Sequence, residues 1–306
     1  MKRSKLIWIL GASAAVAFPR PSSPQSIHEL AIGSLSDSRP GFVLGLIQAG
    51  QITFLESFGT LNSESGDSLL ADHLFPFPAF TELLVTATAQ AMLAGGLLDP
   101  DVPMVRYFPL TSPRLGTVTL RHLLSHTSGI DDARIPARFS WAEVLNQLND
   151  AVLFTDPGMV HSRSRYSFPV AVRMLEKALQ RPFTEVVELA LLEPLGMTRS
   201  TFDLDEAQEL GLAEGVDYDR NDPRSLIPRQ PTSEAMGLPV LVTTVEDVLK
   251  LVGSWMAGGI KGECPWSSGW VDGASRVPGA EGIRAGLVVD RHEGHLRATQ
   301  ESRSLG

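Results

Sequence analysis

The sequence predicts an α+β domain whose strands come from both ends of the chain and whose middle is mostly helical. Residues 41–58 form two β-rich runs separated by Ala49-Gly50, which is typical of a hairpin. Residues 285–299 repeat this arrangement around a short turn. Several helical segments are expected between these two strand regions.

The clearest helix is predicted for residues 79–94, directly after the prolines of residues 74–78. Glu82 lies in its first turn, where the helix dipole favours a carboxylate, and Gly95-Gly96 ends it. Its apolar residues recur at helical spacing, namely Phe80, Leu83, Leu84, Ala87, Ala91 and Met92. This spacing predicts a helix that packs one apolar face into the core.

Further helices are expected along the middle of the chain. Thr119 is a candidate N-cap, and Thr244 with Asp247 has the spacing of a capping box. The expected segments are a short helix within the lead-in after residue 25 and helices at residues 119–125, 141–149, 173–180, 183–192 and 248–256.

Composition fits a soluble globular protein. The chain has 306 residues, 43% hydrophobic and 20% charged, which suits the single domain predicted for residues 38–300. Its net charge of −9 argues against nucleic acid or an anionic membrane surface as a partner. An acidic balance also serves solubility alone.

The first residues predict export. Lys2, Arg3 and Lys5 precede an apolar run, and residues 15–17 (Ala-Val-Ala) have the form of a cleavage site. Residues 1–17 are therefore interpreted as a signal peptide and residues 18–37 as a lead-in. The alternative is an uncleaved anchor, but the run is short for a membrane span. Cleavage removes three positive charges and takes the net charge from −9 to −12 (−9 minus 3). The mature protein is expected to be periplasmic or secreted, with no membrane insertion.

Cysteine usage limits the chemistry. Cys264 is the single cysteine, which excludes an internal disulfide and a multi-cysteine metal site. No spacing of histidines and carboxylates suggests a metal, and no motif suggests a cofactor. The oligomeric state is left open.

Several strings of residues carry a family resemblance. They are LFPFPAFTE at residues 74–82, TLRHLLSHTSGI at 119–130, PGMVHSRSRYSF at 157–168 and EPLGM at 193–197. With them the chain resembles the penicillin-binding-protein-like serine hydrolases, which include class C beta-lactamases and related esterases. The resemblance covers most of residues 38–258 and, more weakly, 259–300.

The resemblance implies a beta-lactamase/transpeptidase-like fold with three α/β/α layers. An antiparallel sheet would combine residues 41–58 with the C-terminal tail, and helices would flank it. A mostly helical region would span about 75–235. The active-site cleft would lie between the sheet and the helical region.

The family's first catalytic element is a Ser-x-x-Lys pair at a helix start, where one turn sets the amine beside the hydroxyl. In the family's register, the serine position is Ala79 and the lysine position is Glu82. The five lysines are Lys2, Lys5, Lys177, Lys250 and Lys261, and none has a serine three residues before it. The nucleophile and the base that the family uses are therefore missing.

The family's second element, Tyr-x-Asn, is half present. Tyr166 matches, but Phe168 stands at the asparagine position. With its partners missing, Tyr166 is interpreted as a half-buried aromatic whose hydroxyl reaches the surface. The third element, Lys-Thr-Gly or His-x-Gly on a strand, is not located, and the string at residues 292–294 (His-Glu-Gly) is interpreted as a turn.

Other nucleophiles are weakly supported. His126 lies between Ser125 and Ser128, but sequence neighbours rarely form a triad, so a capped turn is expected. His161 with Tyr166 and Glu82 is a further acid–base set that no spacing supports.

Three functions are carried forward. The first is an exported, catalytically inactive family member, with a small-molecule or peptide ligand in the old cleft. The second is a hydrolase, acting on esters, amides or beta-lactams, with an active site rebuilt around Glu82, Tyr166 and a histidine. The third is a module that binds a ligand or partner on another surface.

Overall fold

The computed structural model describes residues 6–10, 24–33, 41–48, 50–61, 66–110, 112–132, 153–213, 215–218, 226–229, 234–235, 238–256, 283–284, 287–292 and 295–299. The chain forms two compact units built from interleaved segments. Unit 1 comprises Met1–Phe77, Leu195–Ser233 and Leu241–Ala257, and unit 2 comprises Pro78–Pro194, Glu234–Val240 and Gly258–Gly306. The single domain at residues 38–300 stays a prediction, whereas the α+β class is confirmed.

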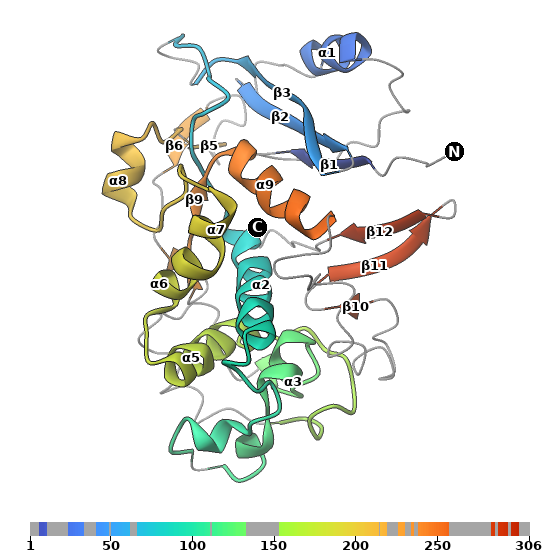
Figure 1. Cartoon of the computed structure of the whole chain (residues 1–306), viewed down its shortest axis with the longest axis vertical. Coiled ribbons are helices and arrows are strands. Elements are labelled where there is room, and N and C mark those ends of the chain that lie inside the picture. Colours follow the sequence, from blue (N-terminus) through green and yellow to red (C-terminus); the bar gives the residue numbers. More distant parts are fainter. Residues whose placement is uncertain are drawn as a thin grey trace. The chain divides into compact units, whose positions relative to one another are not determined.

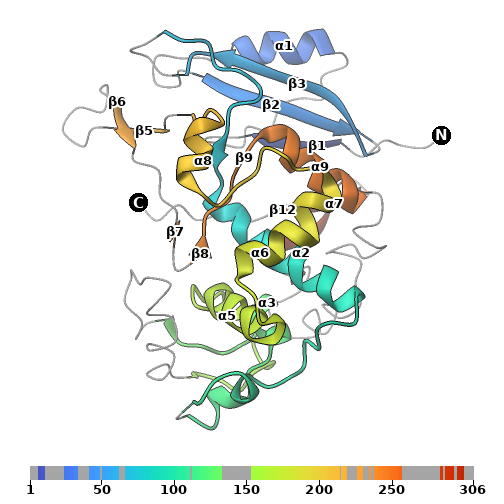
Figure 2. The ribbon, with the colours of Figure 1, turned by 60° about the vertical axis from the view of Figure 1, so that its left-hand side comes forward.

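Unit 1 contains the predicted hairpin. β2 (Gly41–Gln48) and β3 (Gln51–Gly59) pair antiparallel, with a register shift at Leu46/Ile47, and β1 (Leu6–Leu10) pairs with the other edge of β2 (Figure 1). The expected short helix of the lead-in is α1 (Pro24–Ile32), which contacts β3 (Figure 2). Their shared core contains Ile27, Ala31, Phe42, Leu44, Leu46, Phe54 and Phe58.

Helix α9 (Val245–Met256) packs on β2 through two glycines. A Cβ at Gly45 would lie 2.6 Å from a methyl carbon of Leu249, and one at Gly253 would lie 2.8 Å from Ile47 Cδ1. At both distances a Cβ would force the end of the neighbouring side chain to move, so glycine at residues 45 and 253 favours the close approach of helix and strand. The sequence predicted this helix to start at Val248, three residues late.

The rest of unit 1 consists of short elements. β4 (Phe75–Pro76) pairs with β9 (Val242–Thr243), and β5 (Gly215–Tyr218) pairs with β6 (Leu226–Arg229). α8 (Leu204–Glu209) is capped by the Asp203 carboxylate, which accepts from the backbone N–H groups of residues 205 and 206. Leu74, Ala207 and Val242 form a small core beside these elements.

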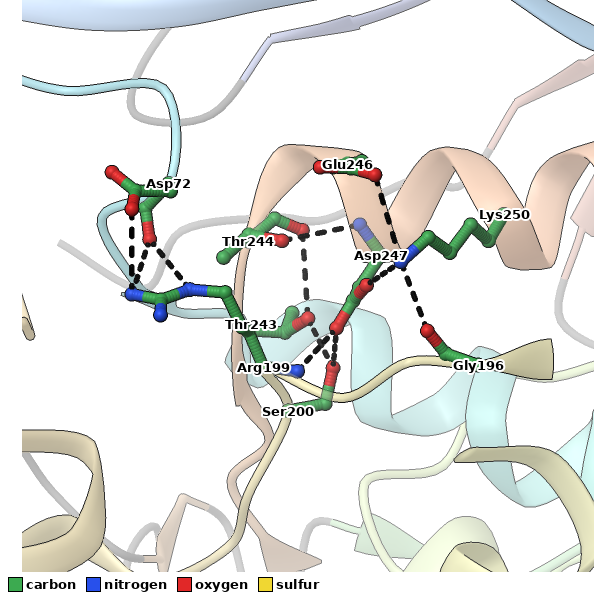
Figure 3. A network of polar contacts seen from close by, with 9 residues as sticks. All are labelled: Asp72, Gly196, Arg199, Ser200, Thr243, Thr244, Glu246, Asp247 and Lys250. Atoms are coloured by element: carbon green, nitrogen blue, oxygen red, sulfur yellow. Dashed lines mark hydrogen bonds and ion pairs between the residues drawn. The ribbon is translucent and has the colours of Figure 1, made fainter. Parts of the chain in front are cut away.

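A buried carboxylate ties α9 to the loop after the EPLGM string. Asp247, 1% exposed, accepts hydrogen bonds from Arg199 N (2.9 Å), Ser200 Oγ (2.9 Å) and Lys250 Nζ (2.7 Å) (Figure 3). Its own backbone N–H donates to Thr244 Oγ1 at 3.1 Å, as the predicted cap requires. One carboxylate thus holds two segments of unit 1 that are 47 residues apart in sequence.

The centre of unit 2 is helix α2 (Thr81–Ala94), which follows the 3₁₀ turn η1 (Pro78–Phe80). The predicted helix is confirmed, and Gly95 and Gly96 donate to carbonyls of its last turn. The expectation of one apolar face is wrong, because residues 81–91 are all buried. The threonine and alanine side chains of α2 make this burial feasible because they are small. In addition, the Thr86 hydroxyl donates a hydrogen bond to Glu82 O at 3.2 Å.

The other helices of unit 2 follow the predicted order. Thr119 caps α3 (Leu120–Leu124) by accepting from His122 N, while His122 completes a capping box. The expected helix at 173–180 starts earlier, as α5 (Ser167–Leu179). The expected helix at 183–192 is α6 (Phe183–Val187) followed by a π-helical turn, η6 (Glu188–Leu192), and then by α7 (Glu193–Leu195). The helix predicted at 141–149 lies outside the described residues.

The remaining pieces of unit 2 include β7 (Glu234–Ala235), which pairs with β8 (Leu238–Pro239), and two 3₁₀ turns, η2 (Met104–Arg106) and η3 (Leu115–Thr117).

The C-terminal tail forms the predicted hairpin but in a sheet of its own. β11 (Leu287–His292) pairs with β12 (His295–Thr299), and β10 (Ile283–Arg284) completes three strands. The prediction of one sheet joining residues 41–58 to the tail is wrong for the described strands. The described strands of the tail pair with one another, β10 with β11 and β11 with β12.

Candidate active site

The site that the family would use starts at η1 and the first turn of α2. Ala79, which the sequence analysis aligned with the family's serine, lies in η1 and has no hydroxyl or thiol to attack a substrate. Glu82 is the second residue of α2, one turn further along, with a side chain that is 11% exposed. A methyl group and a carboxylate thus stand at the two residues that the sequence analysis aligned with the family's nucleophile and base.

Glu82 is held by an arginine that the sequence analysis did not single out. Nη2 of Arg163 donates to both carboxylate oxygens of Glu82, at 2.9 and 3.1 Å. The Arg163 side chain is 42% exposed, so the pair lies at the boundary between interior and solvent. At the residue that the sequence analysis aligned with the family's lysine, this chain has a carboxylate paired with a guanidinium.

The loop that carries Arg163 is fixed by Asp132. Its Oδ1 accepts from Ser164 Oγ and its Oδ2 from Arg165 N, both at 2.7 Å. Ser162 N also donates to His126 O at 2.8 Å. Because residues on both sides of Arg163 are anchored, its guanidinium reaches Glu82 from a defined backbone. No local pattern could reveal this pair, since its members are 81 residues apart.

Tyr166 and Phe168 are core residues at the start of α5. Tyr166 is 0% exposed and Phe168 is 1% exposed. The interpretation of Tyr166 as half-buried, with its hydroxyl at the surface, is therefore wrong. The Phe168 ring packs against the His126 ring with centroids 5.3 Å apart. Phe168, which the sequence analysis aligned with the family's asparagine, is thus a buried apolar residue.

His126 is buried in the turn after α3. It has a left-handed backbone (φ 54°) and is 4% exposed. Burial, and then the positive charges of Arg163 and His161, lower its pKa to about 3, so the imidazole is neutral at neutral pH. No hydrogen bond joins His126 to Ser125 or Ser128, and Ser125 Oγ donates to Arg121 O at 2.7 Å. The prediction of a capped turn is confirmed.

The His126 and His161 rings meet edge to face, with centroids 5.9 Å apart. Burial lowers the pKa of His161 as well. Among the described residues, no group of three or more histidine, cysteine or acidic side chains could hold a metal ion. Glu82, Tyr166, His126 and His161 lie in one region of unit 2. Because Arg163 binds the Glu82 carboxylate, however, the acid–base set of Glu82, Tyr166 and His161 contains no free carboxylate base.

A groove of about 510 Å³ lies elsewhere in unit 2, lined by Pro113, Arg114, Thr117, His122, Asp156 and Pro157. None of the four family positions (Ala79, Glu82, Tyr166 and Phe168) lines it. The cleft expected between the sheet and the helical region stays a prediction. Within the described residues, no helix is both long and apolar enough to cross a bilayer.

Comparison with known proteins then decides the family. The model of the beta-lactamase family matches residues 28–296. The chain belongs to the beta-lactamase family. A curated relative is Esterase EstB of Burkholderia gladioli, which is 29% identical over 181 residues. That match covers 51% of this chain and 45% of the esterase, so it extends over less than half of the relative.

Solved structures show the same fold. The octameric penicillin-binding protein homologue of Pyrococcus abyssi has a TM-score of 0.71 at 20% identity, covering 89% of this chain and 66% of that one. The D-amino acid amidase of Ochrobactrum anthropi has a TM-score of 0.65 at 18% identity, covering 89% and 83%. A class C beta-lactamase of Rhodobacter sphaeroides has a TM-score of 0.63 at 19% identity, covering 82% and 68%. At these identities the likeness concerns the fold alone.

The Glu82–Arg163 pair predicts an asymmetric response to mutation. Arg163→Gln should lower the free energy of unfolding by about 2 kcal/mol, because it removes the guanidinium from a largely buried carboxylate. Glu82→Gln should cost under about 1 kcal/mol, because it leaves a cation that water reaches. Urea unfolding of both variants and of the double variant measures the difference. Equal costs, or a larger cost for Glu82→Gln, would contradict this account of the pair.

Proposed function

We propose that this beta-lactamase family member is exported and does not catalyse acyl transfer. The observation that carries the proposal is the Glu82–Arg163 ion pair at the position of the family's lysine, one turn after Ala79. Acyl transfer in this family needs a nucleophile and an adjacent base that can accept its proton. An alanine offers neither the nucleophile nor its proton, and a carboxylate bound to arginine is a poor base.

Other residues of unit 2 compensate for the loss of the catalytic pair, which distinguishes this loss from a random inactivating mutation. Replacing lysine by glutamate in a buried position reverses a charge, and Arg163 supplies the opposite charge. Phe168 replaces a polar residue by an aromatic side chain with 1% exposure, and it packs on His126. This region therefore serves the stability of the fold. Binding of a small molecule or peptide in the former cleft is the role proposed for the exported protein.

A hydrolase with a rebuilt site is less well supported. It would need Glu82 or a histidine as an accessible base. Glu82 is engaged by Arg163, and His126 is 4% exposed with a strongly lowered pKa. Esterase or amidase activity like that named for the relatives would thus require a base that these contacts do not supply.

Covalent labelling tests the catalytic half of the proposal. Purified protein should remain unlabelled by a fluorescent penicillin and should not turn over nitrocefin, p-nitrophenyl esters or D-amino acid amides. An active relative serves as the positive control. Labelling that disappears when a single serine is replaced would overturn the proposal, and so would turnover that Glu82→Gln abolishes.

Restoring the family residues tests the assignment of positions. The variant Ala79→Ser, Glu82→Lys, Arg163→Gln should acquire slow acylation by penicillin, detected as an added mass on the intact protein. The matched control Ala79→Ser, Glu82→Lys keeps Arg163, which would face the new lysine amine and oppose its approach. It should therefore acylate more slowly and unfold at a lower urea concentration. Equal behaviour of the two variants would show that residue 82 does not occupy the lysine position.

Export is measured separately. The protein produced with its own N-terminus in a bacterial host should appear in the periplasm or medium, with a mass that corresponds to cleavage after Ala17. Retention of Met1 in the exported fraction would contradict this half of the proposal and leave catalytic inactivity untouched.

A further inference from the structure

Residues 153–163 of unit 2, called the strap below, are bonded to the turn at residues 126–130, which carries His126. Three backbone hydrogen bonds join the two segments. They run from Phe154 N to Gly129 O at 3.0 Å, from Gly158 N to Thr127 O at 2.8 Å and from Ser162 N to His126 O at 2.8 Å. The strap exposes Phe154, Met159 and Val160 to solvent. A segment that buries so few apolar side chains opens at a lower free energy than the core beside it.

Two histidine rings meet where the strap contacts the turn. His126, on the turn, and His161, on the strap, lie edge to face with ring centroids 5.9 Å apart. Nδ1 of His126 and Nε2 of His161 are buried, and neither atom has a hydrogen-bond partner among the described residues. A neutral imidazole tolerates this arrangement, because it has one N–H and one lone pair and can keep the lone pair at the unpartnered nitrogen.

Protonated imidazoles do not fit the closed strap. Protonation places an N–H on both ring nitrogens, so each buried atom would become a donor without an acceptor. The surrounding charges also oppose protonation, since Arg163 and His161 face His126 from the strap. From α5, the apolar ring of Phe168 contacts His126. The carboxylate of Glu82, on α2, is bound by Arg163.

We propose that acid releases the strap from the turn. Protonation of His126 and His161 separates residues 153–163 from residues 126–130 and exposes both rings to water beside the Glu82–Arg163 pair, while the helices of unit 2 stay folded. This pH-sensitive switch goes beyond the proposed function, because it requires neither a bound ligand nor export.

The direction of the pH dependence follows from the two states of the strap. Burial lowers the pKa of both histidines in the closed state, to about 3 for His126, whereas exposure in the open state returns each toward the ordinary value of 6.5. The histidines therefore favour the closed state fully above pH 6.5, and this preference is lost as the pH falls. One proton changes the opening equilibrium about tenfold per pH unit, so one histidine raises it about 30-fold between pH 8 and pH 5.

Native-state hydrogen exchange of the full chain tests the proposal. Protection of the amides of Phe154, Gly158 and Ser162 should fall about 30-fold between pH 8 and pH 5 if one histidine responds, and further if both do, after correction for the intrinsic pH dependence of exchange. Low urea concentrations should leave the exchange of these amides unchanged, because a local opening exposes little surface. The same concentrations should accelerate exchange of the buried α2 amides.

The double variant His126→Asn, His161→Asn should remove the pH dependence of the strap amides. Its matched control is His28→Asn, because His28 is an exposed histidine of unit 1 that pairs with Glu56, and this variant should keep the full response. A fall in protection of less than about tenfold in the unmodified chain would overturn the proposal, and so would a fall that persists in the double variant.

The urea series gives an independent decision that needs the unmodified chain alone, so it holds even if the double variant does not fold. Strap amides whose exchange accelerates with urea in parallel with the α2 amides would overturn the proposal, since the strap would then open only when the whole of unit 2 unfolds.

Discussion

Replacing Asp247 by alanine should lower the free energy of unfolding by about 3 kcal/mol, because buried donors lose their acceptor. The Asp247 carboxylate accepts from Arg199 N, Ser200 Oγ and Lys250 Nζ. Its side chain is 2% exposed, so water cannot replace these bonds without rearrangement of the loop. Urea unfolding followed by circular dichroism measures the loss.

The neighbouring Glu246 is the matched control. Its carboxylate pairs with the same lysine at 3.6 Å but is 49% exposed. Glu246→Ala should therefore change the free energy of unfolding by less than about 0.5 kcal/mol. Equal losses for the two alanine variants would show that the hydrogen bonds to residues 199 and 200 do not contribute as argued.

Acid should destabilise the protein well above the range in which carboxylates titrate, and His126 should cause much of the effect. Burial is the main reason that its pKa falls from 6.5 to about 3 in the folded state, with Arg163 and His161 adding to it. The unfolded chain binds a proton at this histidine below pH 6.5, whereas the folded chain does not until about pH 3. Stability from this group is thus fully present above pH 6.5 and is lost as the pH falls toward 3.

The expected slope is about 1.4 kcal/mol per pH unit for one proton. Burial also lowers the pKa of His122 and His161, so both act in the same direction. His126→Asn should flatten the pH dependence, because asparagine tolerates the left-handed backbone and does not titrate. At about pH 8 the histidine binds no proton in either state, so the change in the free energy of unfolding caused by His126→Asn measures lost packing alone. An unchanged slope in the variant would contradict a buried, neutral His126.

Local sequence patterns predicted a structural feature correctly where all the residues that determine it lie in one segment. Thr119 and Thr244 cap their helices as expected, and Gly95-Gly96 ends α2. The hairpin of β2 and β3 was predictable because its two β-rich runs and its turn lie within 20 residues. The extent of α5 was underestimated, since its first residues, from Ser167 onward, are set by burial against other helices.

Features that depend on distant residues were missed or wrongly placed. The burial of α2 on all sides depends on α5, α6 and η6, which pack around its small side chains. The pairing partners of the C-terminal strands also lie beyond the reach of local patterns, because β10, β11 and β12 pair with one another. Glu82, which accepts from Arg163, and the donors Arg199 N and Ser200 Oγ to Asp247 lie at least 47 residues from their partners in sequence, so no spacing rule identifies these bonds.

The sequence by itself determined the family, and it placed Ala79 and Glu82 where the resemblance expects a serine and a lysine. Only the tertiary structure shows which contacts the residues in this region make. Arg163 neutralises Glu82, and Phe168 joins the core against His126. The physical reason is that the absence of a hydroxyl or an amine can be read from residue types. The partner of a buried charge, in contrast, is set by which segments the fold brings within hydrogen-bonding distance.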